Sequence, residues 1–199
     1  MALANNESTA ECMDATGNGG FSILEVLVAI TIMTVAVAGL AQMVALSTRA
    51  NTSARATTYA AVLAQQKMEQ LRSLTWGFDV MGLPVTDTTS DIAVVPESAA
   101  GGSGLSPSPV NSLGASIAGY CDFVDTFGRP LGGGTTPPAG TAYIRRWSIE
   151  PLPGNPDKTI VLKVLVTRWG SRADAAAWSS GRRAPDEAWL IGVKTRKAS

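Results

Sequence analysis

Hydrophobic residues are concentrated at one end of the chain. Between Val26 and Thr48 there are 23 consecutive residues without a formal charge. A helix needs about 20 mostly apolar residues to cross a bilayer, so this run is long enough. Polar and basic positions return at Arg49, Asn51 and Arg55. The pattern predicts a transmembrane helix over residues 21–48 that leaves the membrane near Arg49.

A second, narrower apolar pattern follows directly. Apolar residues recur at spacings of three and four, which places them on one face of a helix; they are Ala60, Leu63, Ala64, Met68, Leu71 and Leu74. Residues 21–74 contain no proline and a single glycine, Gly39. We therefore expect the same helix to continue as an amphipathic segment over residues 49–75, with its stripe covered by other elements.

Residues 76–140 have a different composition. They hold more than half of the 20 glycines and of the 11 prolines in the chain. Clusters such as Gly132-Gly133-Gly134 and Pro137-Pro138 interrupt long elements. We expect a largely irregular region here, with short strands at residues 92–95 and 120–124.

Residues 141–199 have the alternating pattern of β-strands. The clearest strand spans residues 159–169, because Ile160, Leu162, Val164 and Val166 fall on one side of it. Residues 143–149 and 189–195 alternate in the same way, and residues 173–178 could form one helical turn. We therefore expect an antiparallel sheet whose inner face covers the apolar stripe of the helix. The predicted fold class is α+β: one long N-terminal helix packed on a small antiparallel sheet.

The start of the apolar helix has an unusual sequence. Gly19-Gly20-Phe21-Ser22-Ile23-Leu24-Glu25 places an aromatic residue after two glycines, and a carboxylate within the apolar flank. A charged side chain in lipid costs about 2.5–3.5 kcal/mol at the helix centre, and less near its end. Glu25 is therefore a candidate functional residue, since a plain anchor has no need of it.

This sequence closely resembles the processing signal of type IV pilins and of type II secretion pseudopilins. The resemblance implies that a prepilin peptidase, which is also the methyltransferase, cuts between Gly20 and Phe21 and methylates the new Phe21 amine. It also implies that Glu25 pairs with the N-terminal amine of a neighbouring subunit during assembly. A buried carboxylate is tolerable when a cation pairs with it. Residues 62–72 are similar, more weakly, to the same helix in minor pilins of the PilV type and in the I-type pseudopilins.

Residues 1–20 are expected to be a leader peptide that the working protein lacks. They hold three acids, Glu7, Glu11 and Asp14, and no base, so their removal would leave a net charge of +3. Leaders of this family are usually short and basic, and this one departs from that pattern. Either Met13 is the true start, or orientation is set by the secretion machinery and Glu25. An ordinary secretory signal would have a basic start and a cleavage site after the apolar run.

Composition argues against common chemistries. The chain has no histidine, which removes the commonest general base and metal ligand. Loss of the leader would remove Cys12 and leave Cys121 without an intrachain partner. No catalytic motif, phosphate loop or calcium loop is recognisable, and Asp122 and Asp125 are too few for the last of these. We expect no enzyme activity, no cofactor and no metal.

A set of basic and aromatic residues could form a surface that binds nucleic acid. Arginines lie near tryptophans at Arg145-Arg146, Trp147, Arg168, Trp169, Arg172, Trp178 and Arg182-Arg183. Basic groups bind phosphates and aromatic rings stack on bases. The small net charge argues against nucleic acid as a partner.

The resemblance thus implies a structural subunit of a type IV pilus-like filament, with a preference for a minor pilin that primes or caps assembly. Its expected partners are the prepilin peptidase, other pilins or pseudopilins, and the inner-membrane assembly platform. We expect a single-pass inner-membrane protein with its C-terminal domain outside the cytoplasm, later held in a filament or at the cell surface. A type II secretion pseudopilin is the alternative within this architecture. A single-pass protein with an anchored binding domain is the alternative of another class.

Overall fold

One long helix dominates the first part of the structure. The computed structural model describes residues 20–170 and 186–196, and helix α1 spans Ile23–Ser73 without a break. Absence of proline allows this continuity, because each helical residue from Val26 onward can donate its amide to the carbonyl four residues earlier. Hydroxyls of Thr31 and Thr34 in the apolar half bond to the carbonyls four residues earlier, so they too are satisfied within the helix. The prediction of a single long helix is confirmed.

The chain divides into two compact units, residues 1–47 and 48–199. In the first unit, every described residue is exposed. The second unit contains the rest of α1, two sheets and the connecting loops.

The larger sheet has five antiparallel strands in the order β4-β3-β5-β6-β7. Its strands are β3 (Cys121–Val124), β4 (Pro130–Gly133), β5 (Tyr143–Pro151), β6 (Thr159–Arg168) and β7 (Ala188–Thr195). Strands β5, β6 and β7 form the expected meander, with Trp147 opposite Val164 and Val164 opposite Leu190. Strand β6 lies between β5 and β7, so it is a central strand of the sheet.

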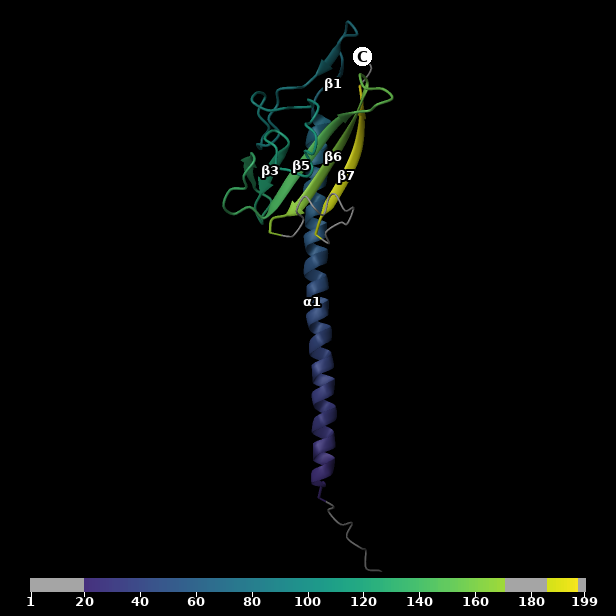
Figure 1. Cartoon of the computed structure of the whole chain (residues 1–199), viewed down its shortest axis with the longest axis vertical. Helices are drawn as coiled ribbons and strands as arrows, with labels where there is room; N and C mark the ends of the chain where they lie inside the picture. The colour runs from purple at the N-terminus through teal and green to yellow at the C-terminus, as the bar shows by residue number, and fades with distance from the viewer. Residues whose placement is uncertain (1–19, 171–185, 197–199) are drawn as a thin grey trace, which may run out of the picture. The chain divides into compact units, whose positions relative to one another are not determined.

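The core lies between this sheet and the second half of α1. All six residues of the predicted stripe are buried, with exposed fractions from 0% for Ala60 to 7% for Leu74. They contact one face of β5 and β6, including Trp147, Leu162 and Val164, which are fully buried. In Figure 1 the strands β3, β5, β6 and β7 lie side by side over this part of α1. The amphipathic pattern therefore predicted the covered face correctly.

One basic side chain of β7, Lys194, lies at the C-terminal end of α1. The Lys194 Nζ donates to the carbonyls of Arg72, at 2.5 Å, and of Leu74. Arg72 is one of the last residues of α1, whose carbonyls have no partner within the helix, and Leu74 follows the helix directly. A cation is also favourable at this end of the helix dipole. The helix thus ends where β7 supplies its missing donors.

A two-stranded sheet follows α1 directly. Strand β1 (Trp76–Phe78) pairs with β2 (Pro84–Thr86). Arg196 stacks on the Trp76 ring, 3.8 Å from its centroid, and donates to the carbonyls of Gly77 and Val85. The connecting turn is closed by Asp79, whose carboxylate accepts the amides of Met81 and Leu83.

Residues 76–140 contain more regular structure than their composition indicated. They contribute β1 and β2 to the small sheet and β3 and β4 to the large one, so the large sheet extends beyond residues 141–199. The strand expected at residues 92–95 is wrong, since only an isolated bridge joins Asp91 to Ser98 there. Ile92 lies in a loop, and its side chain is buried. A short apolar run does not by itself tell such a buried loop residue from a strand residue. The helical turn expected at 173–178 lies outside the described residues.

Candidate functional site

The start of α1 presents an accessible peptide segment. Gly20, Phe21 and Ser22 precede the helix, and the Phe21 side chain is 81% exposed. Ser22 caps the helix, because its hydroxyl accepts the Leu24 amide at 3.3 Å and its carbonyl accepts the Val26 amide at 3.1 Å. Such capping fixes where a helix begins. The bond between Gly20 and Phe21 therefore lies just outside the helix, in backbone that an enzyme could reach.

Glu25 lies in the first turn of the helix, three residues after the cap. A carboxylate at this place is favoured by the positive end of the helix dipole. The residue is exposed, and the ion pairs within the described part of the chain do not include it. Its charge is thus available to a cation from outside the chain.

An uncovered apolar surface follows Glu25. Large apolar side chains from Val26 to Leu46 are between 45% and 71% exposed. Within the described ranges, α1 is the one helix that is long and apolar enough to cross a membrane. An exposed apolar surface of this size is rare on soluble monomers and indicates a lipid or protein environment.

A buried charged cluster that the sequence patterns did not reveal joins the helix to the sheet. The Lys67 Nζ lies 2.6 Å from an Asp122 carboxylate oxygen, and both side chains are fully buried. The Arg145 guanidinium donates to both oxygens of the same carboxylate, at 2.7 and 2.8 Å. Lys67 also donates to the Ile92 carbonyl at 2.5 Å and lies 4.6 Å from the centre of the Trp147 ring. One cluster therefore connects α1, β3, β5 and the 87–105 loop.

The cluster carries two cations and one anion. Burial lowers the pKa of Lys67 from 10.5 to about 8, and the attraction of Asp122 offsets only part of that effect. Desolvation thus outweighs pairing, as expected for an ammonium group enclosed by apolar side chains. A sequence signal existed: Lys67 occupies a stripe position between Ala64 and Leu71, and Asp122 interrupts the apolar run from Tyr120 to Val124.

The basic and aromatic group does not form one surface. Arg145 is buried in the cluster, and Trp147 is fully buried in the core. Arg146 lies on the opposite face of the sheet, where it donates to Ser116 and Thr167. Arg172, Trp178 and Arg182-Arg183 lie outside the described residues.

Other candidates have structural roles. Cys121 is a buried free thiol 3.2 Å from the Gly134 carbonyl, and burial raises its pKa. Asp125 closes a turn by accepting the amides of Phe127 and Arg129. The described residues contain no cluster of three potential metal ligands. Cys12 lies outside the described residues.

Comparison with protein families matches residues 16–41 to the prokaryotic N-terminal methylation motif. No curated protein and no solved structure matches the chain. The matched range contains Gly20, Phe21, Glu25 and the first half of the apolar run. The chain therefore carries the N-terminal signal of type IV pilins and pseudopilins, and its fold has a pilin-like arrangement of one long helix on an antiparallel sheet.

Proposed function

We propose that this chain is a structural subunit of a type IV pilus-like filament, a minor pilin that primes or caps assembly. The observation that carries the proposal is the order of three features along one helix end. An accessible Gly20–Phe21 bond is followed by Glu25, which has no ion-pair partner among the described residues, and then by an uncharged, exposed helix surface. The methylation motif supports a pilin or pseudopilin class rather than an enzyme.

Cleavage would create a cation where the helix begins. Before cleavage, Phe21 has a neutral peptide nitrogen; afterwards it has a free amine, which methylation leaves basic. This amine would lie one helical turn from Glu25 of its own chain and could pair with Glu25 of a neighbour. Pairing would offset the cost of placing the carboxylate among apolar helices. Residues 21–48 would then serve first as the inner-membrane anchor and later as the packing surface of the filament.

The second unit supports the preference for a minor subunit. Its 76–140 segment contributes a separate hairpin and a loop held to the helix by the Lys67–Ile92 bond. Such additions give the subunit a surface of its own, as a priming or capping position requires. The domain would lie outside the cytoplasm once the apolar helix is in the inner membrane.

Intact mass tests the processing step. The protein is extracted from membranes of cells with and without the prepilin peptidase. The expected mass corresponds to residues 21–199 plus one methyl group, only when the peptidase is present. A mass that retains the leader in both strains would refute the proposal and leave a membrane-anchored domain.

Filament incorporation tests the role of Glu25. Glu25→Gln keeps the side-chain size and removes the charge, so cleavage should persist while incorporation into sheared filaments falls at least tenfold. Glu69→Gln, on the exposed side of α1, is the matched control and should be incorporated normally. Equal incorporation of both variants would exclude the proposed pairing. A parallel assay of type II secretion separates a pilin from a pseudopilin, which shares the same signal.

A further inference from the structure

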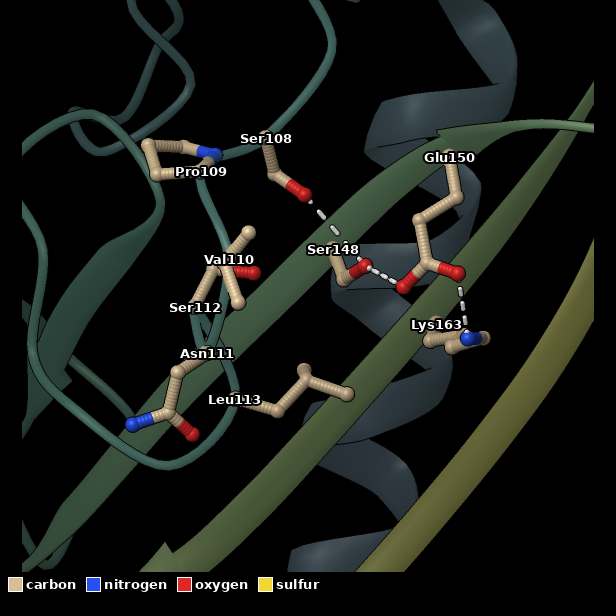
Figure 2. A pocket seen from close by; sticks show the side chains of 9 residues that line it. All are labelled: Ser108, Pro109, Val110, Asn111, Ser112, Leu113, Ser148, Glu150 and Lys163. Atoms are coloured by element: carbon tan, nitrogen blue, oxygen red, sulfur yellow. Dashed lines mark hydrogen bonds and ion pairs between the residues drawn. The ribbon is translucent and has the colours of Figure 1, made fainter.

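A half-open pocket lies on the sheet face that is turned away from α1. Its volume is about 300 Å³, and loop residues 108–113 form one wall while β5 and β6 form the other. Figure 2 shows the loop in front of the two strands and the helix behind them. Neither the processing signal nor the buried charged cluster involves this pocket.

The loop wall is held in place by the strand beneath it. The Ser108 amide donates to the Ile149 carbonyl at 2.9 Å, and the Ser108 hydroxyl accepts the Ile149 amide at 3.1 Å. The Ser108 and Ser148 hydroxyls are 3.3 Å apart. These bonds fix the wall before any ligand arrives, and preorganisation lowers the entropic cost of binding.

A polar chain crosses the strand wall. Ser148 donates to one Glu150 carboxylate oxygen at 2.5 Å, and the Lys163 Nζ lies 2.6 Å from the other. Bonds from Lys163 and Ser148 hold the pKa of Glu150 below its usual value, so it is ionised at neutral pH. The side chains of Lys163 and Glu150 are 26% and 48% exposed, so a ligand can reach both.

The charges restrict the class of ligand. A singly charged ligand would gain one partner and be repelled by the other, because the carboxylate and the ammonium are adjacent. A neutral ligand with neighbouring hydroxyls avoids this conflict, since one hydroxyl can donate to Glu150 while the next accepts from Lys163. The spacing of these two groups is close to that of the oxygens in a vicinal diol. Hydrogen bonds to charged groups are also the stronger ones.

We propose that this pocket binds a neutral sugar ring, with Glu150 and Lys163 contacting two adjacent hydroxyls and Ser108 a third. The pocket volume is at the lower end of the range for small-molecule sites, which suits one ring. The described lining residues include no aromatic side chain for stacking, so dissociation constants in the millimolar range are expected. The site would let the subunit contact glycans independently of its place in a filament.

Saturation-transfer NMR on the full chain tests this proposal. The protein is kept in a detergent without a sugar headgroup and is mixed with glucose, galactose, mannose or N-acetylglucosamine. At least one sugar should show transfer, and Glu150→Ala with Lys163→Ala should weaken its affinity about tenfold or more. This double change leaves the net charge unaltered.

A matched control removes a comparable ion pair elsewhere. Glu69 and Arg72 lie 3.2 Å apart on the exposed side of α1, and changing both to alanine should leave sugar binding unchanged. Thermal unfolding of each variant shows that the fold persists. The proposal is overturned if no sugar shows transfer, if the pocket variant binds as the wild type does, or if free leucine binds there and the sugars do not. None of these results would alter the assignment of the processing signal.

Discussion

Removal of the one anion in the buried cluster should destabilise the second unit strongly. Asp122→Asn keeps the side-chain size but leaves Lys67 and Arg145 facing a neutral amide. Both cations are buried, with Arg145 only 1% exposed and Lys67 fully enclosed. Lys67 can relieve the conflict by losing its proton, since burial already lowers its pKa to about 8. Arg145 cannot lose its proton, because a guanidinium remains charged in proteins.

The size of the effect follows from this difference. Breaking a buried ion pair by removing one partner costs about 3–5 kcal/mol. Because Lys67 can become neutral, we expect Asp122→Asn to lower the free energy of unfolding by about 3 kcal/mol, a cost that comes from Arg145 alone. Lys67→Met instead leaves Asp122 and Arg145 as a balanced pair. It loses the bond to the Ile92 carbonyl, worth about 1–3 kcal/mol, but also removes the desolvated ammonium. The net cost of Lys67→Met should therefore stay below about 2 kcal/mol.

Urea unfolding of the full chain in detergent measures both variants. Tryptophan fluorescence is a suitable probe, because Trp147 is fully buried beside the cluster. With a slope of about 2 kcal/mol per molar urea, Asp122→Asn should lower the midpoint by roughly 1.5 M. Lys67→Met should lower it by less than about 1 M on the same scale. If Lys67→Met proves the more damaging change, the reasoning that an uncompensated arginine sets the cost is refuted.

Three further outcomes follow from other contacts. The pKa of Lys67 is lower in the folded state, so between pH 8 and 10.5 this side chain binds more protons in the unfolded chain and contributes a rise of folding stability with pH; Lys67→Met should remove this contribution and so make the slope of stability against pH less positive in urea titrations at stepped pH. Lys194→Met removes the donor to the helix carbonyls and should cost about 1–2 kcal/mol, measured by the same unfolding assay, with Lys158→Met as an exposed control. Gly104→Ala should cost more than about 1 kcal/mol, because φ is +49° and the new Cβ would lie 2.5 Å from the Asp87 carbonyl oxygen; an unchanged thermal midpoint would contradict this.

Periodicity carried most of the information that the sequence offered about the fold. The helix stripe and the alternation in β5, β6 and β7 are repeated patterns, and each repeat adds to the signal. The pairing of β3 and β4 had no such support, because β4 (Pro130–Gly133) has a proline and two glycines in four residues. The position of β4 in the sheet depends on the hairpin that joins it to β3, and on the pairing of β3 with β5.

The candidate functional residues were recognisable from the sequence to the extent that they lie within one local motif. Gly20, Phe21 and Glu25 are close in sequence, so their combination was visible without a structure. The charged cluster combines Lys67, Asp122 and Arg145 from three distant elements, and only the fold brings them together. The pocket is hidden in the same way, since Ser108 and Ser148 are 40 positions apart.

The donors that complete α1 have a consequence for biosynthesis. Lys194 lies 123 residues after Leu71, so the helix end is made long before the strand that supplies its last partners. At about 5–20 residues per second, roughly 6–25 s of synthesis separate the two. During this interval the apolar stripe and Lys67 lack the sheet that later covers them. The nascent chain therefore exposes apolar surface for this time, and a chaperone that holds the stripe until β7 emerges would raise the yield of folded protein.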